Sequence, residues 1–426
     1  PRPWPTTPRD GSLTVMVNFG YLGVSSSLHD AASVDRMLAE LADNLQNAGG
    51  TPTADPGLDA PLAIVVLTGG TEQAVLQAAS ARPDREPVIV VAHPWHNSLP
   101  AALEAVARLH QDGRPARIAV LDGGQRSVAG LAAAAADVAV ARELHRLTIG
   151  VVGTPSDWLV ASCPTPEAVR AAWGPKVIAV DIDDTIARYQ RTAADAGTAL
   201  ADAMVTAAGQ VDEPVPGAVA AAAQVHPVLR DLVREHHLDA LTIRCFDLVT
   251  RLGTTGCLAL AELNDAGVTA GCEGDLPSTI AMLWTRLVTG QVPWMANPSQ
   301  VRLDEELLVL AHCTVPRSLT TGYRIESHFE SGLGAALTGD LPAGPVTLVR
   351  IGGRDLRRHW ITDAEAVEHP HQDGLCRTQL AVRLPAVAIE ELLAAPLGNH
   401  VVVVPGRHAD RLRRWLAATT VPGTSA

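Results

Sequence analysis

Short apolar runs separated by amphipathic stretches set the pattern at the start of the chain. Four runs rich in Val, Ile, Leu and Ala read as strands buried on both faces, namely Leu13–Asn18, Leu62–Leu67, Val88–Ala92 and Arg117–Leu121. Helical stretches lie between or after them, at Val34–Ala48, Pro100–Asp112 and Val128–Leu144. Continuous apolar strands alternating with helices are typical of a parallel sheet covered on both faces. Residues 1–147 are therefore predicted to form a doubly wound α/β domain.

The same alternation starts again near residue 148 and changes character near residue 307. Strands are predicted at Leu147–Val152, Val177–Val180 and Ala240–Arg244, with helices at Val225–His236 and Ser278–Leu287. Beyond that point the runs are strand-like with few helices between them, at Leu307–Ala311, Val346–Arg350, Leu380–Leu384 and Val401–Val404. We predict three domains, 1–147, 148–306 and 307–426: two doubly wound, Rossmann- or flavodoxin-like parallel sheets followed by a β-rich C-terminal domain.

The amino-acid composition argues against some classes of binding partner. The 426 residues are 47% hydrophobic and 19% charged, with a net charge of −13 from 46 acidic and 33 basic residues. This balance argues against a nucleic-acid backbone or an anionic membrane as the main partner and fits a protein that handles small molecules. The longest apolar run, near Gly130–Ala141, is interrupted by Asp137 and is too short to span a bilayer. No C-x-x-C pair occurs among the six cysteines, and a cytoplasmic location is expected.

One generic motif points to a phosphatase. Val177–Val180 is followed by Asp181, Asp183 and Thr185, the D-x-D-x-T pattern of haloacid-dehalogenase-type phosphatases. That chemistry also needs a downstream lysine, and the chain's only Lys, Lys176, precedes the motif. A strand that ends in an acidic loop is the favoured interpretation.

A second constellation of polar residues is spread over the later part of the chain. It comprises Cys272-Glu273-Gly274-Asp275, Trp294-Met295-Ala296-Asn297, His312-Cys313 and Gly398-Asn399-His400. Polar residues at strand ends are where α/β proteins place their sites. Each of these residues alone also fits a solvated loop acid or a structural histidine.

In order and spacing, these motifs resemble the L-fucose isomerase / L-arabinose isomerase superfamily, in its divergent fucose isomerase-like branch. The resemblance extends over most of the chain, through Thr68–Glu72, His96–Glu104, Gly150–Gly153, Pro155–Leu159, Arg244-Cys245 and Cys376–Gln379. It implies two α/β domains and a C-terminal β-barrel-like domain. It also implies a homotrimer or homohexamer in which the first domain of a neighbour closes each active site. The family reaction is aldose–ketose isomerisation through an ene-diol, with a divalent metal, usually Mn²⁺, on the sugar's carbonyl and adjacent hydroxyl.

The resemblance assigns roles to individual residues. Glu273 matches the first metal-binding carboxylate and proton shuttle, His400 the distant imidazole ligand, and His312 a further histidine ligand. The second catalytic carboxylate is expected 24 residues beyond the first, where this chain has Asn297. An amide can offer oxygen to a metal but cannot exchange a proton near pH 7, so weaker or lost metal binding and a modified mechanism are expected.

Asp275 is the nearest replacement for the missing acid, and a loop shift bringing in Asp304 or Glu305 is the alternative. Substrate contacts are expected from Trp158, which could stack on a sugar face, and from His96, Asn97 and Asn399.

Three functions remain open. The first is a metal-dependent sugar isomerase with an altered acid/base pair, acting on a carbohydrate-like substrate. The second is an epimerase, lyase or transferase on the same scaffold, since Glu273 and His400 are kept while one proton shuttle is lost. The third is a sugar-binding protein without catalysis.

Overall fold

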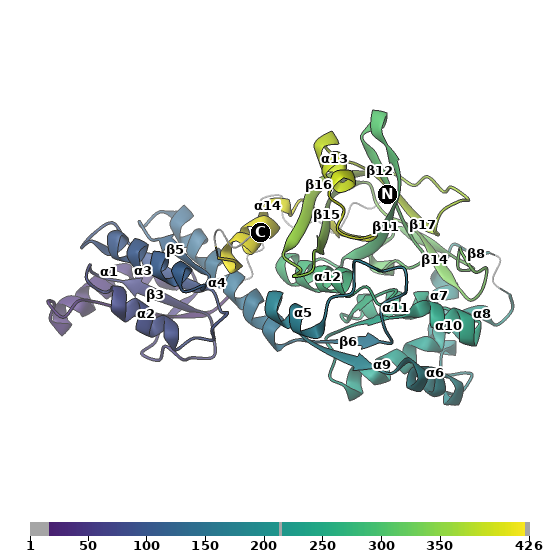
Figure 1. The fold of residues 1–426 in the computed structure, drawn as a ribbon, viewed down its shortest axis with the longest axis horizontal. Coiled ribbons are helices and arrows are strands. Elements are labelled where there is room, and N and C mark those ends of the chain that lie inside the picture. Colours follow the sequence, from purple (N-terminus) through teal and green to yellow (C-terminus); the bar gives the residue numbers. More distant parts are fainter. Residues whose placement is uncertain (1–16, 213–214, 422–426) are drawn as a thin grey trace. The chain divides into compact units, whose positions relative to one another are not determined.

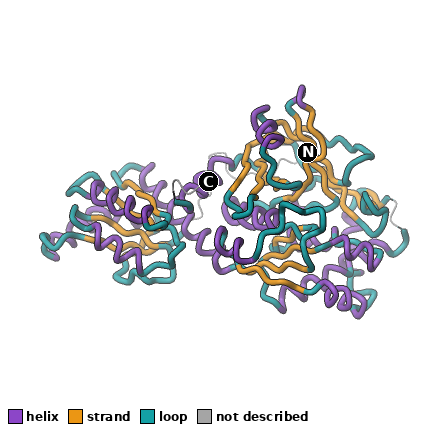
Figure 2. Tube along the Cα trace, viewed as in Figure 1, coloured by secondary structure: helices purple, strands orange, loops and turns teal. Residues whose placement is uncertain are grey.

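The computed structural model describes residues 17–212 and 215–421, and its elements are drawn in Figures 1 and 2. The chain divides into two compact units. Of the described residues, one unit comprises residues 17–144 and 413–421, and the other comprises residues 145–412. The central sheet and the C-terminal barrel lie within the same unit. The three-domain division at residues 147 and 306 stays a prediction.

The first unit contains a five-stranded parallel sheet. Its strands are β1 (Phe19–Val24), β2 (Gly50–Pro52), β3 (Leu62–Val66), β4 (Val88–Ala92) and β5 (Ala116–Val120), and its helices are α1 (Ala31–Asn47), α2 (Glu72–Ser80), α3 (Ser98–Gln111) and α4 (Gln125–Arg146). The strand order is β2-β1-β3-β4-β5. Strands β3 and β4 are buried along their whole length, which explains their continuous apolar sequence.

Two apolar clusters flank this sheet. One joins alternate strand residues such as Val65 and Val91 to Leu41 of α1 and Leu131 of α4. The other joins the intervening residues to α2 and α3. Helices thus cover both faces, as the sequence predicts. The predicted strand Leu13–Asn18 lies for the most part outside the described residues, and the first described strand is β1.

The second unit begins with a four-stranded parallel sheet. Its strands are β6 (Thr148–Val152), β7 (Lys176–Val180), β9 (Ala240–Ile243) and β10 (Thr269–Gly271), and its helices are α5 (Pro166–Ala172), α6 (Ile182–Arg191), α7 (Thr198–Ala207), α8 (Ala218–Ala223), α9 (Val225–Glu235), α10 (Cys245–Leu252), α11 (Cys257–Asp265) and α12 (Leu276–Thr289). The order β10-β9-β6-β7 places β9 on the side of β6 opposite β7. The winding direction therefore switches between β6 and β9. Ligand sites of open α/β sheets lie at the carboxyl ends of strands near such a switch.

A closed antiparallel barrel of six strands follows. Its strands are β11 (Trp294–Arg302), β12 (Leu307–His312), β15 (Gly344–Gly352), β16 (Arg358–Glu368), β17 (Thr378–Arg383) and β18 (Val401–Pro405), in the order β11-β12-β17-β16-β15-β18. A small sheet beside it is formed by β14 (Ala336–Asp340), β13 (Gly322–Glu326) and β8 (Gln210–Val211). The remaining elements are α13 (Ala386–Ala394), α14 (Ala409–Thr419) and the 3₁₀ turns η1 (Leu303–Glu305) and η2 (Arg317–Leu319).

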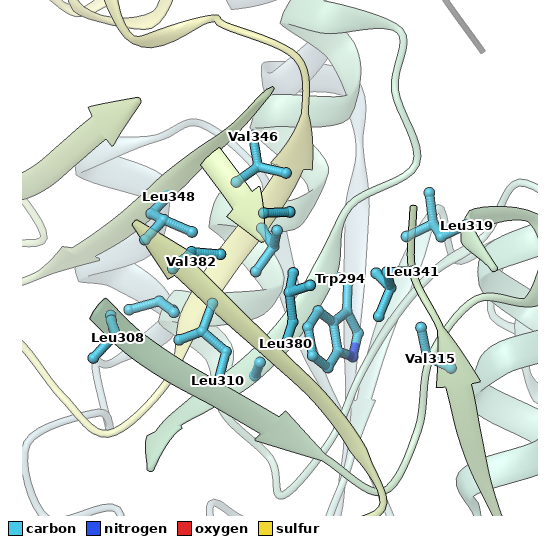
Figure 3. Packing of buried hydrophobic residues seen from close by; sticks show 14 of the residues in the cluster. Trp294, Leu308, Leu310, Val315, Leu319, Leu341, Val346, Leu348, Leu380 and Val382 are labelled. Carbon is cyan, nitrogen blue, oxygen red and sulfur yellow. The ribbon is translucent and has the colours of Figure 1, made fainter. Parts of the chain in front are cut away.

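Aliphatic side chains fill the barrel (Figure 3). Leu308 and Leu310 of β12 belong to one buried cluster with Leu348 of β15 and Val382 of β17. Trp294 of β11 is also buried in this cluster and donates its indole N–H to the Thr314 carbonyl at 2.7 Å. Closing the sheet leaves no unpaired barrel edge, and alternate residues can then face a dry interior.

Two barrel strands are absent from the sequence-based assignment. Strand β11 contains Pro298, which cannot donate a ladder hydrogen bond, and its pairing with β12 shifts register between Pro298 and Gln300. The bulge accommodates the proline, but a central proline is typical of a non-strand segment. Strand β16 was likewise not predicted. It carries charged residues at intervals, and pairing with β15 and β17 stabilises it.

Candidate active site

The Glu273 loop lies at the carboxyl end of β10, near the switch point of the second sheet. Glu273 and Gly274 both have left-handed backbone conformations, with φ of 62° and 73°. A Cβ on Gly274 would lie 2.7 Å from the Thr154 carbonyl oxygen and from Pro155 Cα, so only glycine fits against the loop after β6. The Ser156 amide donates to the Glu273 carbonyl at 2.8 Å. Contacts with the loop after β6 thus hold Glu273 in a conformation that is unfavourable for a side chain.

Three side chains from distant parts of the sequence meet at this loop. Glu273, His312 and His400 each offer one ligand atom, and these atoms all lie within 4.8 Å of one another. His312 is the last residue of β12, and His400 directly precedes β18, so barrel strands deliver both imidazoles. Nε2 of His400 lies 3.5 Å from Oε1 of Glu273. The arrangement brings together the three residues that the resemblance assigns as metal ligands.

Asp275 contacts Nδ1 of His400 and so fixes the orientation of the imidazole ring. It is fully buried, begins α12 by accepting a hydrogen bond from the Ser278 amide at 2.8 Å, and lies 2.8 Å from Nδ1 of His400. An ionised carboxylate can only accept, so Nδ1 carries the proton and the lone pair of a neutral ring lies on Nε2. That Nε2 is buried and has no hydrogen-bond partner among the described residues. A carboxylate behind a histidine whose other nitrogen is free is the usual support of a metal ligand. The residues therefore fit a divalent metal.

A buried arginine pairs with Asp275 on its other side. Arg350 of β15 is 1% exposed, and its Nη1 lies 3.1 Å from Oδ2 of Asp275. The same guanidinium donates to Ser162 Oγ at 2.6 Å, to Ser278 Oγ and to the Leu397 carbonyl. The charge of Asp275 is thus balanced inside the protein, because an unpaired buried carboxylate would be very costly.

The site side chains shift one another's pKa values. Burial alone would raise the pKa of Asp275, but the charge of Arg350 and then the hydrogen bond from His400 outweigh it and hold that pKa well below 3.8. Burial likewise opposes ionisation of Glu273, yet its close contact with His400 and the charge of that ring leave its pKa below the usual value. Burial and the charge of His400 lower the pKa of His312 to about 4. Glu273 is therefore ionised and His312 neutral at pH 7, as metal binding requires.

The pKa of His400 is raised, whereas that of His312 is lowered. Burial disfavours the charged form of His400, but the hydrogen bond with Asp275 and the nearby charge of Glu273 outweigh that effect and raise its pKa above 6.5. A cation binding at Nε2 has to displace a proton from this ring at lower pH, so metal affinity is expected to fall as pH falls.

A cavity of about 470 Å³, which includes space open to solvent, lies in front of this cluster. Glu273, Asn297, His312 and several cysteines line it. Asn297, on β11, pairs in the barrel with Ala311, next to His312. The residue at the position of the expected second carboxylate therefore faces the same cavity as the cluster.

Trp158 contacts the site through Glu273. Its indole N–H donates to Oε2 of Glu273 at 2.6 Å, and the residue is 49% exposed. It makes a T-shaped contact with Phe246, a cavity-lining residue, with the ring centroids 4.8 Å apart. Trp158 thus orients the carboxylate while leaving part of its ring open.

The other residues predicted to contact substrate are exposed. Asn399 lies in the bend before His400. His96 and Asn97 belong to the first unit, where both have left-handed backbone conformations before α3. Their role in substrate binding stays a prediction.

The alternative acids and the phosphatase motif lie elsewhere. Asp304 and Glu305 are exposed on η1 and do not line the cavity. Asp181 is the N-cap of α6, and Asp183 forms an ion pair with Arg251. These contacts fit the structural interpretation of the D-x-D-x-T segment.

Arg350 and His328 are site residues that sequence reasoning missed. Arg350 could have been identified from the sequence, because it is a charged residue at the end of a predicted apolar strand. A charged residue in such a place is buried only when it has a partner of opposite charge. No sequence pattern indicated His328, since it lies in the loop between β13 and β14 and reaches the cavity only through the tertiary fold.

We expect the substitution Gly398→Ala to disturb the packing of Arg350, the partner of Asp275. Gly398 has φ of 145°, and a Cβ there would lie 2.1 Å from Nη2 of Arg350, whose side chain is locked on all sides. Overpacking of this kind costs about 1–3 kcal/mol. Urea denaturation should show that loss for Gly398→Ala and none for Gly374→Ala, where a Cβ meets open space. Equal stability of the two variants would show that Arg350 can move aside.

A comparison with known proteins finds relatives of similar sequence. No protein-family model matches the chain. It is 27% identical over 284 residues to sulfoquinovose isomerase of Alkalicoccus urumqiensis, spanning 63% of this chain and 62% of that protein. It is 29% identical over 193 residues to sulfoquinovose isomerase of Clostridium sp. (strain MSTE9), spanning 43% of each. Among the described helices, none has the length and apolar character needed to cross a membrane. The chain is thus similar, over less than two thirds of the length of these relatives, to proteins named as sugar isomerases.

Proposed function

We propose that this protein is a divalent-metal-dependent aldose–ketose isomerase. The observation that carries the proposal is the Glu273–His312–His400 cluster with Asp275 fixing the free Nε2 of His400. Similarity to two proteins named sulfoquinovose isomerase supports the reaction class independently.

The ligand set favours a metal such as Mn²⁺. Glu273 supplies a carboxylate, His312 and His400 supply imidazoles, and the amide oxygen of Asn297 faces the same cavity. Mixed oxygen and nitrogen ligands suit first-row divalent ions. When bound, such an ion polarises the sugar carbonyl and stabilises the oxyanion that forms next to it.

The protein's own residues handle orientation and protons. Glu273 is ionised and directed into the cavity by Trp158, so it can carry a proton between the neighbouring sugar oxygens. Asn297 can donate or accept a hydrogen bond but cannot take up that proton.

Sulfoquinovose is the first substrate to test, because both relatives are named for it. The protein with added Mn²⁺ is incubated in D₂O with sulfoquinovose, pentoses and 6-deoxyhexoses. We expect deuterium at C1 or C2 of at least one aldose, together with the ketose. If no sugar acquires deuterium while metal is bound, the chain is not an aldose–ketose isomerase, and an enzyme of another class or a sugar-binding protein replaces the proposal.

Asn297→Asp is expected to tighten metal binding. A second carboxylate facing the cavity adds one negative charge near the cation, which corresponds to about tenfold or more in affinity. Competitive titration with a fluorescent Mn²⁺ chelator measures this change. Asn47→Asp, the same substitution at an exposed position of α1, should leave the affinity unchanged. An unchanged affinity in Asn297→Asp would place residue 297 outside the metal's reach.

We also propose the assembly implied by the resemblance, a homotrimer or homohexamer with sites completed by a neighbouring subunit. Light scattering on the eluting protein tests it, and a monomer with full activity contradicts it.

A further inference from the structure

We propose that Cys245 and Cys272 form an oxidant-sensitive thiol pair in the wall of the active-site cavity, and that their cross-linking by a peroxide weakens the neighbouring metal site. The proposal starts from the distribution of the cysteines. Five of the six line the same cavity as Glu273, whereas Cys163 is exposed and does not line it. The effect on catalysis rests on the isomerase function proposed above, but the cross-link itself does not.

The two sulfurs of the thiol pair are already in contact. Sγ of Cys245 lies 3.0 Å from Sγ of Cys272, within hydrogen-bonding distance for thiols. Both residues are buried, with 7% and 5% of their surface exposed. The S–S bond of a disulfide is about 2.05 Å long, so the sulfurs have to approach each other by only about 1 Å.

The second parallel sheet fixes the backbone on both sides of the thiol pair. Cys245 begins α10 just after β9, Cys272 directly follows β10, and these two strands are hydrogen-bonded neighbours. The Thr242 hydroxyl of β9 donates to the Cys272 carbonyl at 3.3 Å. The Gly274 amide donates to the Ile243 carbonyl of β9 at 3.0 Å. Because the strands already hold the two thiols together, the cross-link costs little further conformational entropy.

The cavity gives a small oxidant access to the thiol pair. Cys245 and Cys272 both line the space of about 470 Å³ in front of the metal-ligand cluster, and part of this space is open to solvent. Hydrogen peroxide is small enough to enter it, whereas the thiol of another protein cannot reach a buried sulfur. We therefore name a peroxide as the oxidant.

The oxidation balances with one peroxide for each thiol pair. The first sulfur, as a thiolate, forms a bond to one peroxide oxygen, the O–O bond breaks, and hydroxide leaves. The second sulfur then displaces hydroxide from the resulting sulfenic acid, and the S–S bond forms. The thiols lose two electrons to the peroxide, and their two protons end in the two water molecules that are formed.

The cross-link acts on the metal site through Cys272, which precedes Glu273 in the chain. Glu273 has φ of 62°, a conformation that is unfavourable for a residue with a side chain. Its Oε1 lies 3.5 Å from Nε2 of His400. When the Cys272 sulfur moves by about 1 Å toward Cys245, this strained backbone takes up part of the movement, and the carboxylate shifts relative to the imidazole. Displacements of this size lower reaction rates by about 10²-fold.

Peptide mapping of the full-length protein tests whether the cross-link forms. Metal-free protein is treated with hydrogen peroxide at pH 8 and desalted. We expect the number of free thiols, counted after denaturation, to fall from six to four. Trypsin should then release residues 245–251 joined by a disulfide to residues 252–286. The second peptide also contains Cys257, so fragment ions are needed to place the bond at Cys272.

The effect on the site is measured on the same samples. Mn²⁺ affinity, from competitive titration with a fluorescent chelator, is expected to fall about tenfold or more, and deuterium exchange into the aldose about 10²-fold. Both should return after treatment with dithiothreitol and desalting. Cys163→Ser and Cys376→Ala are the matched controls and should respond to peroxide as the wild type does. In Cys245→Ser and in Cys272→Ser, treated and untreated samples should bind Mn²⁺ equally.

Several results overturn the proposal. They are the absence of a cross-linked peptide, a disulfide between other cysteines, and a mapped Cys245–Cys272 disulfide that leaves Mn²⁺ affinity unchanged. If a serine variant does not fold, as judged by circular dichroism, the alanine variant replaces it, and the wild-type peptide map needs no variant. Absence of exchange in the reduced protein contradicts the isomerase function, while the map and the Mn²⁺ titration still decide the thiol pair.

Discussion

Replacing Glu273 with glutamine is expected to lower the isomerisation rate by about 10²–10⁴-fold and to release the bound divalent metal. The glutamine keeps the size of the side chain but removes the charge that pairs with His400 and replaces one of the two carboxylate oxygens with an NH₂ group. General acid–base groups contribute factors of this size, and loss of a charged ligand weakens the metal site at the same time. Steady-state kinetics with added Mn²⁺ and metal analysis of the dialysed protein measure the two effects.

Glu390→Gln on α13 is the matched control, since that glutamate is exposed on the surface of the helix. It should keep both activity and metal. A Glu273→Gln protein that retains stoichiometric metal and wild-type kcat would contradict the assignment of Glu273 as ligand and proton carrier.

Arg350→Met is expected to lower the free energy of unfolding by about 3–5 kcal/mol. The methionine fills similar space but leaves Asp275 as a buried carboxylate without its cation, and breaking a buried ion pair by removing one partner has this cost. Asp275→Asn combined with Arg350→Met removes both charges, so the double variant should lose less than the sum of the two single losses. Urea denaturation of the four proteins gives the coupling.

The matched control is Arg108→Met, which breaks the exposed pair with Asp112 and should leave stability unchanged within error. Additive losses at Asp275 and Arg350 would show that the two charges are screened from each other and do not depend on one another.

The same pair predicts how stability depends on pH. The folded pKa of Asp275 lies below its ordinary value of 3.8, so its contribution is complete above that value and is lost as pH falls through the folded pKa. The stability difference between wild type and Arg350→Met should therefore be largest near pH 7 and shrink below about pH 4. Unfolding free energies measured from pH 3 to pH 7 check the sign.

Most of the sheet strands could be read from the sequence because burial on both faces leaves an uninterrupted apolar run. Leu62–Leu67 and Val88–Ala92 coincide with β3 and β4 to within a residue. The barrel was harder to read. Pro298 lies within β11, and β16 mixes charged with apolar residues, so their pairing depends on neighbours far away in the chain.

By itself, the sequence determined the alternation of strands and helices, since the spacing of apolar residues is a local property. The resemblance to a known family added Glu273, His312 and His400 as candidate ligands. Only the tertiary structure decided which of these side chains contact one another. It buried Asp275 against Arg350 and His400, which makes it a support of the histidine, and it brought His328 to the same cavity as Asn297. The physical reason is that a carboxylate's charge state and reach depend on partners up to 125 residues away, and pairing over such distances is fixed by sheet and barrel closure.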